Sequence, residues 1–66
     1  MDVTVNGQSR TVGDGLTLQQ LLAHDRTDTR GCAAAVDGVV VPRAGWGAVV
    51  LVDGQSVELL TAVQGG

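Results

Sequence analysis

Two glycines, Gly65 and Gly66, stand at the end of the sequence and offer a carboxylate on a chain without side chains. Neither residue can pack into a core, and each loses more backbone freedom on ordering than any other residue would. We therefore interpret them as a narrow, extendable strand that presents Gly66 to the active site of another protein. From Ala62 to Gly66 such a strand reaches roughly 13–14 Å at ~3.3–3.6 Å per residue, enough to enter a neighbouring cleft.

The other residues with reactive side chains indicate structural roles. Cys32 is the only cysteine, which excludes an intramolecular disulfide, and its Ala-rich surroundings favour a small buried hydrophobe over a reactive thiol. His24 has no second ligand at metal-binding spacing, which favours a solvated residue at a helix end. Asp14, Asp37 and Asp53 each precede glycine, a pattern typical of turns. We predict no active site, no metal site and no bound cofactor in this chain.

Length and composition predict one small domain. The chain has 66 residues, 44% of them hydrophobic, and Trp46 is its only aromatic residue, so Val, Leu and Ala must build the core. The net charge is −3, and four scattered arginines without any lysine argue against nucleic-acid binding. No apolar run approaches the ~20 residues of a membrane span. The first residues lack the pattern of a signal peptide, so we expect a cytoplasmic protein without a membrane partner.

The first third of the chain predicts a hairpin followed by a helix. Val3 and Val5 alternate with polar residues, and Asn6-Gly7 is the strongest short-range hairpin signal, so residues 8–12 should return as a second strand. Thr17 and Gln20 have the spacing of a capping box at a helix start. The apolar residues of this helix share one face, which should lie on a sheet: Leu18, Leu21 and Leu22.

The remainder of the chain predicts three more strands. Cys32–Val36 is typical of a central strand beneath the helix, and Val39–Val41 forms a short strand that a proline ends. Arg43–Gly47 should be an irregular or single-turn connection, with Trp46 folded back as a plug. Val57–Ala62 is the last strand. The polar segment from Asp25 to Gly31 reads as a loop. The pattern indicates an α+β domain over residues 1–62, with a mixed sheet of four to five strands and one helix across it, and a flexible tail of residues 63–66.

The two faces of the last strand differ in their expected roles. Alternate residues, beginning with Val57 and Leu59, should face the core. An apolar pair on the opposite face, next to a reactive tail, suits reversible contact with partners. We therefore expect a docking surface made of Glu58, Leu60 and Ala62.

Several motifs in a fixed order make the chain resemble the ThiS family, the ubiquitin-like β-grasp sulfur carriers of thiamine biosynthesis. These motifs are Asn6-Gly7, Val36-Asp37-Gly38, Val41-Pro42-Arg43 with Trp46 three residues on, Asp53-Gly54, and the closing residues 57–66. The specific part is Pro-Arg-x-x-Trp combined with the terminal Gly-Gly. The sequence departs from the family only around Trp46, where small residues replace bulkier or charged ones: Gly45, Gly47 and Ala48.

The resemblance implies a sequence of partners for Gly66. An E1-like adenylating enzyme (ThiF-like) would use ATP to activate the Gly66 carboxylate as an acyl-adenylate. Sulfur from a cysteine desulfurase or another persulfide source would then displace AMP and leave a thiocarboxylate, which a thiazole synthase (ThiG-like) would use to build the thiazole ring. Val63, Gln64 and Gly65 would thread the channel of the partner. The chain would be a protein co-substrate and not an enzyme.

Three alternatives remain open from the sequence. Sulfur carriers for molybdopterin or cysteine synthesis have the same kind of terminus. A ubiquitin-like protein modifier would join Gly66 to lysines of its targets, although this chain has no lysine through which to form chains of its own. An interaction module with an inert tail is the third alternative, and removal of Gly65 and Gly66 would leave its function intact.

Overall fold

The structure is a computed structural model and describes residues 1–25 and 31–61. Its elements follow the order that the sequence predicts: β1 (Asp2–Val5), β2 (Gln8–Thr11), α1 (Leu18–Asp25), β3 (Cys32–Val36), β4 (Val39–Val41), the 3-10 helix η1 (Arg43–Ala48) and β5 (Ser56–Thr61). Of the predicted loop between α1 and β3, residues 26–30 lie outside the described residues, as does Ala62, the predicted end of the last strand.

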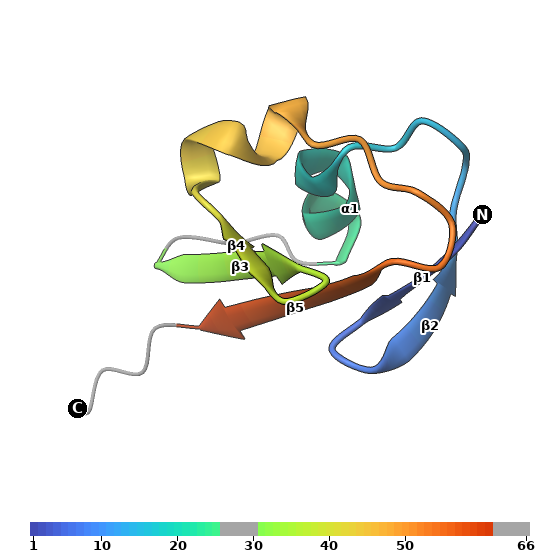
Figure 1. The fold of residues 1–66 in the computed structure, drawn as a ribbon, viewed down its shortest axis with the longest axis horizontal. Coiled ribbons are helices and arrows are strands. Elements are labelled where there is room, and N and C mark those ends of the chain that lie inside the picture. Colours follow the sequence, from blue (N-terminus) through green and yellow to red (C-terminus); the bar gives the residue numbers. More distant parts are fainter. Residues whose placement is uncertain (26–30, 62–66) are drawn as a thin grey trace.

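The described strands form one mixed sheet in the order β2-β1-β5-β3-β4. β1 and β5 run parallel, with Thr4 opposite Ser56 and Val5 opposite Val57, and the other neighbours are antiparallel. β3 is an interior strand, as predicted, but β5 is the central one. Figure 1 shows α1 and η1 on the same side of this sheet. This arrangement confirms the predicted α+β class, with five strands in the described part of the chain.

The β1–β2 hairpin forms around Asn6-Gly7. Both residues have positive φ, 51° and 82° respectively, which asparagine and glycine tolerate better than other residues. Val3 and Val5 of β1 are buried, whereas β2 is largely exposed. The turn predicted from local sequence is thus present and ends β1 at Val5.

The capping box predicted at the start of α1 is present, and both of its hydrogen bonds form. The Gln20 backbone N–H donates to Thr17 Oγ1 at 3.1 Å, and the Thr17 N–H donates to Gln20 Oε1 at 2.9 Å. Leu18, Leu21 and Leu22 are all buried, so the apolar face of the helix covers the sheet as predicted.

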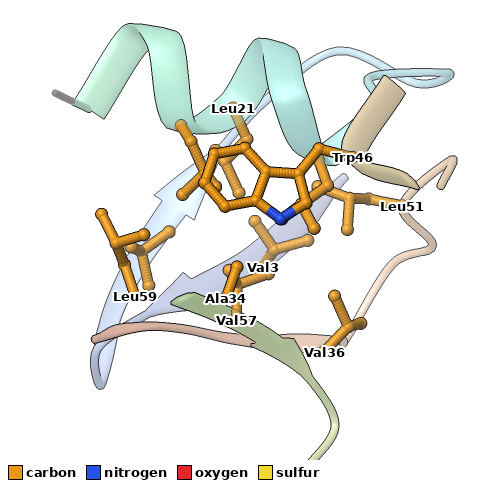
Figure 2. Packing of buried hydrophobic residues seen from close by; sticks show 11 residues of the cluster. Val3, Leu21, Ala34, Val36, Trp46, Leu51, Val57 and Leu59 are labelled. Atoms are coloured by element: carbon orange, nitrogen blue, oxygen red, sulfur yellow. The ribbon is translucent and has the colours of Figure 1, made fainter. Parts of the chain in front are cut away.

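Trp46 fills the space between α1 and the sheet, as the sequence predicts. Its side chain is 3% exposed, and Figure 2 shows the indole beneath the helix and above the buried residues of the strands. The indole Nε1–H donates to the Val41 carbonyl at 2.9 Å, and the Arg43 guanidinium carbon lies 4.9 Å from the ring centroid. The segment that carries Trp46 is a six-residue 3-10 helix, Arg43–Ala48, where the sequence predicts an irregular or single-turn connection.

Candidate functional site: the end of β5 and the outer face of the sheet

β5 leads directly to the residues for which chemistry is expected. It lies between β1 and β3, and its pairing with β3 extends to Cys32 opposite Thr61. The strand therefore keeps one neighbour up to the last described residue, and the tail continues from a paired strand. The residues predicted for the tail and for one end of the docking face lie outside the described residues: Ala62, Val63, Gln64, Gly65 and Gly66.

The two faces of β5 are as predicted. Val57 and Leu59 are buried on the helix side, at 0% and 6% exposure. Glu58 and Leu60 point to the opposite side, which α1 and η1 leave uncovered (Figure 1). Leu60 is 57% exposed, a large value for a leucine in an interior strand. The structure thus places two of the three predicted docking residues on one exposed face, next to the end of the strand.

Neighbouring strands enlarge this apolar region. Across the β3–β5 ladder, Ala33 lies opposite Leu60, and Ala35 lies opposite Glu58. Val40 of β4 lies opposite Ala35 and is 66% exposed. Because residues directly opposite each other share a face of the sheet, these side chains form one surface, which we call the outer patch: Ala33, Ala35, Val40 and Leu60, with Glu58 among them. Ala35 is only 6% exposed, so Ala33, Val40 and Leu60 are the apolar residues that this patch exposes.

Sequence reasoning found Leu60 but not the alanines and the valine beside it. Residues 32–36 and 39–41 are continuous apolar runs, so the sequence does not show which of their side chains face outward or which strand pairs with β5. A weak signal existed in Val39–Val41, where three consecutive valines form an edge strand of which only one face can pack inward. The pairing of distant segments, which the structure provides, is what joins these residues to Leu60.

Cys32 is half-buried, so it is less buried than the small buried hydrophobe that the sequence predicts. It is the first residue of β3, where burial increases toward Ala34 and Val36, and its side chain packs at the margin of the core. Cys32 lies opposite Thr61 and therefore beside the end of β5. The structural role expected for it nevertheless agrees with this packing.

His24 lies away from β5. His24 is exposed near the end of α1, as predicted, and lines a surface hollow together with Arg10 of β2. Residues 1–25 and 31–61 contain no cluster of three or more His, Cys, Asp or Glu side chains that could hold a metal ion. No helix in this part of the chain is long and apolar enough to cross a membrane.

In the part of the chain that the structure describes, one α-helix packs across a mixed sheet with β5 at its centre, the arrangement of a ubiquitin-like β-grasp protein. The sequence model of the ThiS family matches residues 3–66, and this chain belongs to that family of small sulfur carriers. The resemblance based on the turn and tail motifs is therefore confirmed.

Two solved structures agree with this assignment. The crystal structure of the thiamine biosynthesis protein ThiS from Geobacter metallireducens is 32% identical, covers 100% of both chains and superposes with a TM-score of 0.85. An NMR solution structure of a thiamine biosynthesis protein from the same organism is 30% identical, with a TM-score of 0.78, and the match covers 100% of this chain and 88% of that one. No curated protein matches the sequence.

Proposed function

We propose that this chain carries sulfur for thiamine biosynthesis as a thiocarboxylate on Gly66. The observation that supports the proposal most is the continuity of the central strand with a Gly-Gly end in a member of the ThiS family. The similarity to solved thiamine biosynthesis proteins over the whole of this chain supports the pathway. The chain serves as the substrate of its partners and holds neither ATP nor a metal.

The proposed chemistry takes place at the carboxylate of Gly66, a residue that has no side chain. A carboxylate is a poor acyl donor, so an adenylating enzyme first converts it to a mixed anhydride with AMP and releases pyrophosphate. The terminal sulfur of a persulfide attacks the carbonyl carbon and AMP leaves. A second thiol then reduces the resulting acyl disulfide, which leaves the thiocarboxylate and a disulfide. The absence of a Cβ at Gly66 keeps the approach to this carbon open.

The tail and the outer patch have separate tasks in this proposal. Residues 63–66 enter a channel of the partner, where glycine at position 65 allows a narrow path. The outer patch binds beside the mouth of that channel, because Leu60 is the exposed apolar residue closest to the end of β5. Glu58 within the patch favours a partner with a basic group at the facing position. Thiazole synthase would receive the sulfur through the same two features.

Removal of Gly65 and Gly66 tests the proposal. The truncated protein should keep its melting temperature, because the buried core of the described residues extends from Val3 to Leu59. It should also accept no sulfur from the adenylating enzyme and a persulfide donor. A chain extended by one alanine after Gly66 is the matched control. It keeps both glycines but moves the carboxylate to another residue, and it should also accept no sulfur. A truncated protein that supports thiazole formation as well as the full chain would refute the proposal.

A further inference from the structure

Asn6 makes hydrogen bonds that its place in a hairpin turn does not require. Its side chain reaches Leu59, 53 residues away in the sequence, and contacts both polar groups of that residue's backbone. The Leu59 N–H donates to Asn6 Oδ1 at 2.9 Å, and Asn6 Nδ2 donates to the Leu59 carbonyl at 3.4 Å. The Asn6 backbone N–H also donates to the Val57 carbonyl at 2.9 Å. The carboxamide of Asn6 thus occupies the place of one more peptide group of β1.

This contact lies where β5 loses its neighbour on one side. The parallel ladder between β1 and β5 ends with Val5 opposite Val57, because the turn at Asn6-Gly7 redirects the chain. β5 continues to Thr61, paired on its other side with β3. Without Asn6, the strand would be held from one side only over its last residues. Asn6 fixes the β5 backbone at Leu59, and the seven residues that follow, at ~3.3–3.6 Å each, reach roughly 23–25 Å to Gly66.

We propose that Asn6 is a positioning residue for sulfur loading: its side chain holds β5 at Leu59, so that Leu60 and the last described residue of the strand, Thr61, keep a fixed position. The inference rests on the proposed function, since it concerns the delivery of Gly66 to the adenylating enzyme. A partner that binds both the outer patch and the tail needs the two in a fixed relation. With the end of β5 free to move, docking must first order that segment, which weakens binding.

The chain contains a matched comparison at the other end of the same strand. Asp37 also precedes glycine in a tight turn, with a φ of 50°, and its Oδ1 accepts the Ser56 N–H at 2.9 Å. Its backbone N–H donates to the Ser56 carbonyl at 2.8 Å. Asp37 therefore holds the beginning of β5 with the same kind of contact, far along the strand from the tail. Glycine at either position keeps the positive φ of the turn and removes only the side chain.

The experiment compares Asn6→Gly, Asn6→Asp and Asp37→Gly with the wild type in steady-state adenylation by the adenylating enzyme, with the carrier as varied substrate. All proteins are used at a temperature where circular dichroism shows them folded. We expect Asn6→Gly to raise KM about three- to tenfold, the size of one net hydrogen bond, with kcat within about twofold. Asn6→Asp keeps the acceptor for the Leu59 N–H but replaces the donor to the Leu59 carbonyl with a carboxylate oxygen, so its KM should lie between those of the wild type and Asn6→Gly. Asp37→Gly should stay near wild type.

Equal changes in KM for Asn6→Gly and Asp37→Gly would overturn the positioning role and leave the proposed function intact. A wild-type protein that the enzyme does not adenylate would overturn the proposed function and the role together. Amide hydrogen exchange of the wild type gives a readout that needs neither enzyme nor variant. The Leu59 amide should be protected to the same degree as the paired amides of β5, and rapid exchange at Leu59 would refute the inference even if Asn6→Gly does not fold.

Discussion

Leu60→Asp should separate docking from folding. The Leu60 side chain is 57% exposed on the uncovered face of the sheet, so the core loses little when it is replaced. We expect the free energy of unfolding to fall by about 0.5–1 kcal/mol, the range for an exposed strand position that receives a poor strand former. Ala33 lies opposite Leu60 in the sheet, and Glu58 is two residues away on the same face, so the new carboxylate would stand within the outer patch.

The effect on docking should be larger than the effect on folding. Covering the exposed part of a leucine contributes about 1 kcal/mol, from the ~1.5–3 kcal/mol of full burial. Desolvating a carboxylate against an apolar partner surface adds a penalty of about 1 kcal/mol or more. The sum of about 2 kcal/mol corresponds to a KM for the carrier roughly 30-fold higher, at 1.4 kcal/mol for each factor of ten.

Val50→Asp is the matched control for this prediction. Val50 has the same 57% exposure and would give the same change in charge, but it pairs with Thr17 at the start of α1 instead of lying in the sheet. Adenylation kinetics with each variant as the carrier measure KM, and urea denaturation measures stability. A KM for Leu60→Asp that equals that of Val50→Asp would refute the assignment of docking to the outer patch.

Two further changes test the core and the thiol. Trp46→Phe removes the 2.9 Å hydrogen bond to the Val41 carbonyl and part of the buried ring. It should lower the free energy of unfolding by about 2 kcal/mol, measured by urea denaturation followed by circular dichroism. A loss below about 0.5 kcal/mol would show that the indole N–H contributes little. Cys32→Ser should leave the rate of sulfur loading on Gly66 unchanged, because the half-buried thiol packs against the core; complete loss of loading in a folded variant would assign Cys32 a chemical role.

Local signals predicted the elements well because the residues that define them interact with near neighbours. The Asn6-Gly7 turn and the capping box between Thr17 and Gln20 involve contacts within three residues, and both are present in the structure. Trp46 was predicted to be a plug because an aromatic residue alone in a small core is rarely left in solvent. The alternation of β5 likewise fixed which of its residues are buried.

Contacts between distant segments were beyond the reach of these signals. The parallel pairing of β1 with β5 places Asn6 beside Leu59, and no local pattern distinguishes an asparagine that only turns the chain from one that also binds a distant strand. The same applies to Ala33 and Val40, which join Leu60 only through the order of strands. Cys32 was expected to be buried because its neighbours are apolar, but its place at the first position of β3 leaves it at the margin of the core.

The most direct test of the account is the intact mass of the full chain after incubation with ATP, a persulfide donor, a thiol reductant and the adenylating enzyme of the same organism. We expect a gain equal to the replacement of one oxygen by sulfur, which fragmentation maps to Gly66. An unchanged mass, with the enzyme shown to be active on another carrier, would contradict the account. An isopeptide bond between Gly66 and a lysine of another protein would also contradict it and identify a protein modifier.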